Sequence, residues 1–310
     1  MSQQIASLRA GGKRAVADAL ARIETDLETP GVAQLLDAAF ANPKGASLGL
    51  TGPPGVGKST LIDAMIRAWR ADGKTIAVIA VDPSSARSGG ALLGDRTRLT
   101  TDPADPGVFV RSMAARDQLG GVAEITFPAM VLMRALYDLV IVETVGVGQS
   151  ELVIDDVTDL TAFCAQPGSG DALQYMKAGI MEIPDIFVVT KADLGTLATR
   201  TVSDLKGALS LAPEGRGAVP VLSCAATENA GIDALMQEIC TQIAQMLPQA
   251  KRSRMEQVIR WGNRQIGAQF GRRGLHLAHS TGVDNSPDSP FSCNLQRIER
   301  LSAAFTEAFG

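Results

Sequence analysis

The chain of 310 residues is poor in metal-binding side chains. It has only two histidines, His276 and His279. A histidine pair without a cysteine or acidic partner is more often structural or surface-exposed than a metal ligand. The cysteines form no C-x-x-C pair, which favours reduced thiols in a cytosolic protein. They are Cys164, Cys224, Cys240 and Cys293.

Long apolar runs and an excess of basic charge are also absent. No stretch reaches the roughly 18 uncharged apolar residues of a transmembrane helix. The opening residues, MSQQIASLRAGGKR, lack the apolar run of a signal peptide. A net charge of −4 gives no basis for nucleic-acid binding. Since 45% of residues are hydrophobic and 20% charged, the composition is that of a soluble globular protein. We therefore expect a cytoplasmic protein with no membrane and no nucleic-acid partner.

Short apolar runs rich in β-branched residues alternate with longer amphipathic stretches from about residue 46 to residue 245. This alternation predicts an α/β fold with a mostly parallel, doubly wound sheet covered by helices on both faces. An open sheet of this kind binds its ligands at the carboxyl ends of the strands. The expected strands are 46–51, 75–81, 108–111, 138–143, 160–165, 185–190 and 219–223.

Helical extensions are expected on both sides of this core. Residues 3–40 carry apolar positions at helical spacing, with a break near Thr29-Pro30-Gly31. After about residue 246 the strand pattern stops. Residues 250–272 have the pattern of a basic amphipathic helix, 274–292 are expected to be irregular, and 294–309 helical. The predicted divisions are therefore 1–44, 45–245 and 246–310, the last a candidate dimerisation arm.

A phosphate-binding loop follows the first expected strand. Its pattern, G-x-x-x-x-G-K-S, lies between that strand and a helical stretch, as the motif requires. Backbone N–H groups of such a loop surround phosphate oxygens, and the next helix points its positive end at them. Lys58 is expected to reach the β- and γ-phosphates, and Ser59 to bind Mg²⁺. The predicted nucleotide contacts are Gly52, Pro53, Pro54, Gly55, Val56, Gly57, Lys58, Ser59 and Thr60.

Two aspartates are candidate Mg²⁺ ligands. Asp82 ends the second expected strand, where a carboxylate suits a metal beside the phosphates, although Asp-Pro-Ser-Ser also suits a helix N-cap or a turn. Asp95 lies in the glycine-rich and charged stretch 88–98, which suggests a loop that orders around Mg²⁺ and the γ-phosphate. The alternative for Asp95 is a solvated surface loop.

A third element, Glu143-Thr-Val-Gly146, follows the apolar run 139–142. The N–H of Gly146 can bond the γ-phosphate, so that the loop responds to its loss. Glu143 can hold Mg²⁺ through water or orient the attacking water. Gln149 could also position water, but it equally suits a structural amide. The predicted catalytic residues are Lys58, Asp95 and Glu143, and the predicted metal ligands are Ser59, Asp82, Asp95 and Glu143.

The sequence Thr190-Lys191-Ala192-Asp193 matches the guanine-recognition pattern [N/T]-K-x-D. Asp193 can accept from guanine N1–H and the exocyclic amine, a charge-assisted bidentate pair that adenine cannot supply. The aliphatic stem of Lys191 can lie over the purine ring. After the last expected strand, the backbone N–H near Ala226 can meet guanine O6. The predicted base contacts are Thr190, Lys191, Asp193, Cys224, Ala225 and Ala226.

Together these motifs resemble the MeaB/ArgK-type GTPases, the G-protein chaperones of adenosylcobalamin-dependent methylmalonyl-CoA mutase. The resemblance covers about residues 8–245, and its most specific stretches are ETVGVGQSE and DPSS…GDRTR. This sequence has Thr190, Ala225 and Asp117-Gln118 where the family usually has Asn, Ser and Gly-His. The matching stretches are 52–60, 81–98, 108–115, 143–151, 166–171, 179–183 and 190–193.

The resemblance implies a homodimer that uses GTP, GDP and Mg²⁺. It implies slow intrinsic hydrolysis stimulated by the mutase or a related adenosylcobalamin-dependent mutase, with the adenosyltransferase as a further partner. GTP use would gate cofactor loading and protect the mutase. It also groups Asp82, Asp95 and Glu143 around the metal and the catalytic water.

Three alternatives remain. A metal-insertion GTPase of the nickel-enzyme type shares this sheet and loop, but would need soft or imidazole ligands. A transport-linked kinase or ATPase, an older label for this family, would need an acceptor at the γ-phosphate. A binding switch with negligible hydrolysis would keep partner affinity when Glu143 is replaced.

Overall fold

A computed structural model describes residues 3–82, 99, 101–114, 124–144, 154–168, 184–210, 219–279 and 286–309. Its core is one seven-stranded sheet, in which every strand pair is parallel and the order is β3-β2-β4-β1-β5-β6-β7. Each strand falls on an expected apolar run, so the predicted fold class is confirmed. The strands are β1 Ala46–Thr51, β2 Ile76–Asp82, β3 Val108–Ala114, β4 Leu139–Thr144, β5 Leu160–Ala165, β6 Ile186–Val189 and β7 Val221–Ser223.

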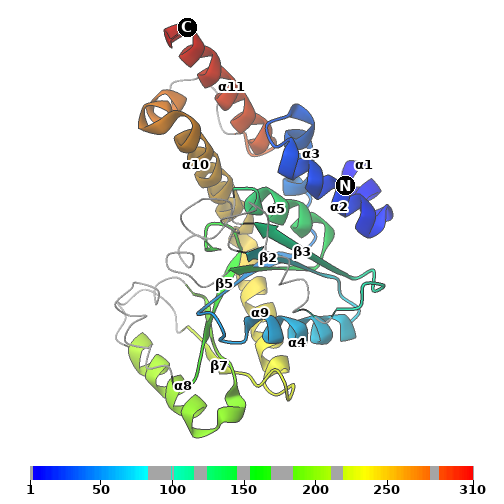
Figure 1. Ribbon diagram of the computed structural model, residues 1–310, viewed down its shortest axis with the longest axis vertical. Helices are drawn as coiled ribbons and strands as arrows, with labels where there is room; N and C mark the ends of the chain where they lie inside the picture. Colours follow the sequence, from blue (N-terminus) through cyan, green and yellow to red (C-terminus); the bar gives the residue numbers. More distant parts are fainter. Residues whose placement is uncertain are drawn as a thin grey trace.

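Helices cover both faces of this sheet, as buried apolar strands on both sides require. On one face, α4 (Lys58–Ala71) and α9 (Ile232–Met246) pack against alternate residues of the central strands, such as Leu48 and Leu50 of β1. On the other face, α5 (Thr126–Leu136) lies over β2 and β4, and α8 (Thr196–Leu209) lies over β5 and β6. Figure 1 shows α4 and α9 together below the sheet and α5 above it.

The amino-terminal helices α1 (Gln3–Ala10), α2 (Gly12–Thr25) and α3 (Pro30–Ala41) confirm the helical pattern and its break. They extend the face covered by α5, and their apolar side chains join the same core. Figure 1 shows them at one end of the molecule, beside the last helix. None of the helices in the described part of the chain is long and apolar enough to cross a bilayer.

At the other end of the chain, α10 (Ala250–His279) and α11 (Pro290–Phe309) rise away from the sheet (Figure 1). The prediction that 274–292 are irregular is wrong at both ends. α10 continues beyond a kink at Gly271, where φ is 64°. α11 begins at Pro290, a favoured first helical residue, because Asp37 of α3 caps it by accepting from the N–H groups of Phe291 and Ser292. A cap supplied from so far along the chain has no local sequence signal.

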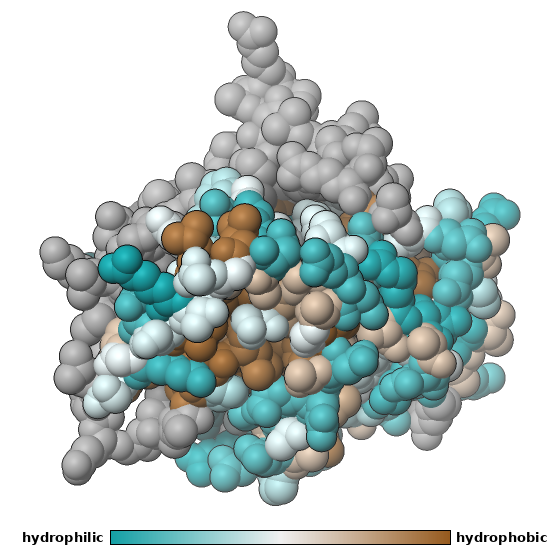
Figure 2. Space-filling model, turned by 90° about the horizontal axis from the view of Figure 1, so that it is seen from below, coloured by the Kyte–Doolittle hydropathy of each residue, from teal (hydrophilic) through white to brown (hydrophobic). Residues whose placement is uncertain are grey.

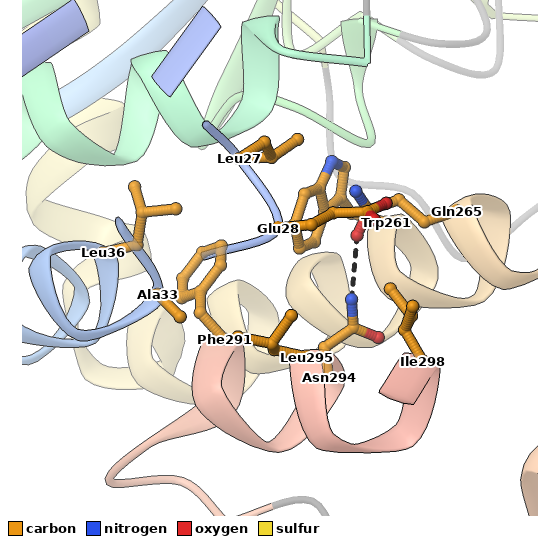
Figure 3. Close-up of a pocket in the computed structure, with 10 residues that line it drawn as sticks. All are labelled: Leu27, Glu28, Ala33, Leu36, Trp261, Gln265, Phe291, Asn294, Leu295 and Ile298. Carbon is orange, nitrogen blue, oxygen red and sulfur yellow. Dashed lines mark hydrogen bonds between the residues drawn. The ribbon is translucent and has the colours of Figure 1, made fainter. Parts of the chain in front are cut away.

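The junction of α3, α10 and α11 encloses a small pocket (Figure 3). Phe291 of α11 packs between Phe40 of α3 and Trp261 of α10, with ring centroids 6.3 and 5.3 Å away. The amide of Asn294 donates to Gln265 Oε1 at 2.8 Å, and both residues are buried. The two terminal extensions therefore share one core although they lie at opposite ends of the sequence.

A buried charge cluster lies at the amino ends of the strands. The carboxylate of Asp159, just before β5, pairs with Arg134 of α5 at 3.1 Å and with Arg254 of α10 at 2.8 Å. It also accepts from the backbone N–H and hydroxyl of Ser47 in β1. The side chains of Asp159 and Arg134 are both 1% exposed. The cluster thus joins α5, α10 and two central strands.

Candidate functional site

The loop between β1 and α4 has the backbone shape that phosphate binding requires. Gly52 has φ 140°, and a Cβ there would lie 2.4 Å from the carbonyl oxygen of Cys164 in β5. Gly57 has φ 102° and immediately precedes α4. Only glycine adopts these conformations at low cost. The loop therefore folds tightly against β5 and directs the amino end of α4 at its own concave side, where an anion is favoured.

Lys58 lies back over this loop. Its Nζ donates to the carbonyl oxygens of Gly52 at 2.7 Å and Pro53 at 3.2 Å, and the residue is 7% exposed. A buried ammonium needs acceptors around it. The contacts hold the cation across the mouth of the loop, where phosphate oxygens can replace the carbonyls as partners.

Ser59 and Glu143 meet beside the loop. The hydroxyl of Ser59, in the first turn of α4, donates to Oε1 of Glu143 in β4 at 3.3 Å. Thr144, the residue after Glu143, donates to the hydroxyl of Thr51 at the end of β1, at 3.1 Å. This bond holds β1 and β4 together at this edge. A hydroxyl and a carboxylate oxygen at this distance are the hard oxygen ligands that Mg²⁺ accepts. These two predicted metal ligands are thus brought together.

The remaining predicted metal ligands are placed less fully. Asp82 is the last residue of β2, the strand next to β4, and lies two positions beyond the residue paired with Glu143. Asp95 and Gly146, like Gln149 and Asp117-Gln118, fall outside the described residues, so their assignments stay predictions. Within the described residues, no group of three or more His, Cys, Asp or Glu side chains is arranged to hold a metal.

The base segment, residues 190–193, is fastened directly to the phosphate loop. The hydroxyl of Thr190 is buried and donates to the carbonyl of Val56 at 2.7 Å. Nζ of Lys191 donates to the carbonyl of Gly55 at 3.0 Å and to Oε1 of Gln166 at 3.4 Å. The sequence motifs did not indicate these bonds. These bonds fix the position of residues 190 and 191 relative to the phosphate loop.

Lys191 has a left-handed backbone conformation, with φ 52°, and precedes a short 3-10 turn, Ala192–Leu194. Asp193 lies in this turn and is exposed. Of the large apolar side chains that remain exposed among the described residues, Leu194 is the last residue of the same turn and Leu197 follows it. Figure 2 shows the end of the molecule at which α8 lies, with apolar residues gathered near the middle of a mostly polar face.

The segment after β7 supports the base segment from the other side. The carbonyl of Cys224 accepts the N–H of Ala192 at 3.1 Å, and the N–H of Cys224 donates to Val189 in β6 at 2.9 Å. Ala225 is buried and pairs with Ala230, while Ala226 is half-buried. The three segments therefore converge at the carboxyl ends of β1, β6 and β7, as predicted for a ligand of this type of sheet.

Two cysteines lie beneath these segments without the properties of nucleophiles. Burial raises the pKa of Cys164 to about 12, against the lowering effect of the Lys58 charge, and burial raises that of Cys224 to about 11. A thiol reacts as its thiolate, which is scarce at such values. Their role is therefore packing below the nucleotide site.

The geometry agrees with comparisons to known proteins. Residues 16–273 match the family described as Methylmalonyl Co-A mutase-associated GTPase MeaB. A Pyrococcus abyssi relative, named provisionally as a GTPase, is 41% identical over 245 residues, which cover 77% of this chain and 75% of that protein. The mitochondrial methylmalonic aciduria type A homolog of Mus musculus is 44% identical over 147 residues, covering 47% of this chain and 35% of that protein.

Solved structures show the same fold. A crystal structure of an LAO/AO transport system kinase aligns with a TM-score of 0.66 and 26% identity, over 98% of this chain and 97% of that one. HypB from Helicobacter pylori, in complex with nickel, aligns with a TM-score of 0.50 and 17% identity, over 69% of this chain and 94% of that one, which shows the fold alone. The phosphate loop, the base segment and the family match lead to one conclusion: the chain belongs to the MeaB family of P-loop GTPases.

Proposed function

We propose that this chain binds GTP and GDP with Mg²⁺, hydrolyses the γ-phosphate of GTP, and uses this cycle to gate adenosylcobalamin loading and protection of methylmalonyl-CoA mutase. The observation that carries the nucleotide proposal is the pair of bonds from Thr190 and Lys191 to the phosphate-loop carbonyls of Val56 and Gly55. They hold Thr190 and Lys191 of the proposed guanine-recognition segment against the phosphate loop.

We assign each residue of this site a separate role. Lys58 and the loop N–H groups hold the phosphates, and Asp193 accepts from the two guanine donors. Ser59 and Glu143 supply oxygens for Mg²⁺, which when bound neutralises phosphate charge. Glu143 lies beside the proposed Mg²⁺ position and also orients the attacking water. Asp82 and Asp95 are proposed as further acids around the metal.

The partner proposal rests on the family to which the chain belongs and on the name of its mouse relative. We expect slow hydrolysis by the isolated chain, because some GTPases receive part of their transition-state stabilisation from a partner. We also propose that the chain works as a homodimer in the cytoplasm.

The test is GTP hydrolysis by the purified chain, measured as released phosphate, with and without purified methylmalonyl-CoA mutase. The proposal predicts slow release alone and faster release with the mutase. Hydrolysis that the mutase leaves unchanged would contradict the partner while keeping the GTPase. Phosphate transferred to a protein acceptor rather than released would favour the kinase alternative.

A further inference from the structure

One face of α10 is bonded to the short segment that leads into β5. Gln257 is buried, and its amide donates to the carbonyl of Thr158 at 2.7 Å. Arg254 pairs with Asp159, and both Arg260 and Arg264 pair with Asp156, at 2.7 and 2.9 Å. These side chains recur every three or four residues, so they share one side of the helix. Four of the residues 154–159 are thus bonded to α10: Asp155, Asp156, Thr158 and Asp159.

The same segment rests on the strand that carries the phosphate loop. A Cβ at Gly49 of β1 would lie 2.4 Å from Cγ1 of Ile154 and 2.7 Å from the hydroxyl of Thr158. Glycine at this position therefore lets residues 154–158 pack on the β1 backbone, three residues before Gly52. In sequence, the segment follows the stretch that begins at Glu143, the acid bonded to Ser59.

A second contact of α10 reaches the residues that lead into α5. The indole N–H of Trp261 donates to the carbonyl of Glu124 at 3.0 Å, and its ring lies 5.8 Å from that of Phe127 in α5. Glu124 ends the connection that begins after β3, the strand beside β2. Trp261 also lines the pocket shared with α3 and α11 (Figure 3).

We infer that α10 transmits the nucleotide state of the site to the carboxy-terminal helices. This inference rests on the proposed function. Two described positions that follow strands β4 and β3 in the sequence, Thr158 and Glu124, bond to this one helix. A nucleotide-dependent displacement of Thr158 or Glu124 must break these bonds or move α10. Because Trp261 packs on Phe291 of α11, a movement of α10 reaches α11 as well.

The chain contains a built-in probe of this transmission. It has only two tryptophans, Trp69 in α4 and Trp261 in α10. In the variant Trp69→Phe, emission comes from Trp261 alone. We expect its emission maximum and intensity to differ between the GDP-bound protein and the protein bound to a non-hydrolysable GTP analogue. Binding of both nucleotides is measured separately, by displacement of a fluorescent GDP derivative excited outside the tryptophan band.

The variant Gln257→Met, made in the same background, removes the bond to Thr158 and retains side-chain volume. It should lose most of the difference in emission between the two nucleotides while still binding both. Gln242→Met is the matched control, because Gln242 bonds only to Glu238 one turn away on α9 among the hydrogen bonds described for it. It should keep the full difference. Thermal melting of each variant verifies that it is folded at the assay temperature.

These measurements distinguish a failure of the α10 inference from a failure of the proposed function. If both nucleotides bind and the Trp261 emission is the same in each state, α10 does not transmit and the inference is overturned, whatever Gln257→Met does. An equal loss in Gln257→Met and Gln242→Met would overturn the route through Thr158. If neither nucleotide binds, the proposed function fails, and the inference fails with it.

Discussion

The two edges of the central sheet carry polar side chains for different purposes. At the carboxyl edge, the cation of Lys58 donates to backbone carbonyls of the phosphate loop, partners that a nucleotide could replace. At the amino edge, the carboxylate of Asp159 is enclosed by Arg134, Arg254 and Ser47. A carboxylate with this many internal partners is suited to fixing the fold.

This difference distinguishes a binding site from a structural cluster of charges. Burial of charge alone does not do so, because Lys58 and Asp159 are both nearly inaccessible to solvent. The nature of the partners does. The described hydrogen-bond acceptors of Lys58 are neutral carbonyls of the phosphate loop, whereas two guanidinium groups compensate the charge of Asp159.

The largest expected effect on stability is that of Asp159→Asn. The change leaves Arg134 and Arg254 buried without a countercharge, and removing one partner of a buried pair costs about 3–5 kcal/mol. Chemical denaturation should show a loss of this size, while GTP affinity of the folded fraction stays near that of the wild type. Lost affinity in a folded, stable variant would contradict the division between the edges.

A smaller effect is expected from Asp193→Asn at the carboxyl edge. The amide keeps one acceptor and replaces the other with a donor that faces the guanine amine, so the bidentate pair is lost. A bidentate base contact gives about 1–3 kcal/mol of discrimination. Competition binding with GTP and ATP should show a reduced preference for GTP at unchanged stability. Preference equal to that of the wild type would refute the assigned role of Asp193.

Lowering the pH should destabilise the protein by protonating Asp159 at the amino edge. Burial alone would raise the pKa of Asp159, but the charge of Arg134, the bond and charge of Arg254 and the N–H of Ser47 lower it to about 2, from 3.8. The carboxylate therefore contributes its full stabilisation, about 2 kcal/mol, above pH 3.8 and loses it as the pH falls toward 2. Unfolding free energies of the wild type and Asp159→Asn should converge over this range. If the difference between the two unfolding free energies did not change with pH, the ionised carboxylate of Asp159 would not be the source of this stabilisation.

The smallest effect is expected from Thr190→Val, which keeps the side-chain shape and removes the hydroxyl bonded to Val56. Loss of one such bond costs about 1 kcal/mol. Since the bond connects base and phosphate segments, we expect GDP affinity to fall about fivefold, measured by titration with a fluorescent derivative. A control is Thr241→Val on α9, whose hydroxyl bonds only within its own helix among the described contacts. Equal losses of GDP affinity in both variants would show that the Thr190 bond acts only through the general stability of the fold.

The sequence predicted the elements of this fold better than their connections. Strand positions follow from runs such as 139–142, and the phosphate loop and base segment follow from motifs with fixed spacing. Burial on both faces of the sheet explains why the apolar runs were so clear. The start of α11 was missed because its cap, Asp37, lies in α3.

Contacts between distant residues had no sequence signal at all. Arg134, Asp159 and Arg254 belong to no motif, and Asp159 is separated from its partners by 25 and 95 positions. The bond from Thr190 to Val56 spans 134 positions. Spacing along a chain predicts contacts only within a helix or between neighbouring strands, so these pairings required the three-dimensional structure.

The central claim is that the loop of Gly52–Ser59 and the base segment form one guanine-nucleotide site. The most direct test compares initial rates of GTP and ATP hydrolysis, side by side, for the wild type and Lys58→Ala. We expect phosphate release from GTP and not from ATP, and a loss of about 10²–10³-fold when the lysine cation is removed. ATP hydrolysed as fast as GTP, or a Lys58→Ala variant as active as the wild type, would contradict it.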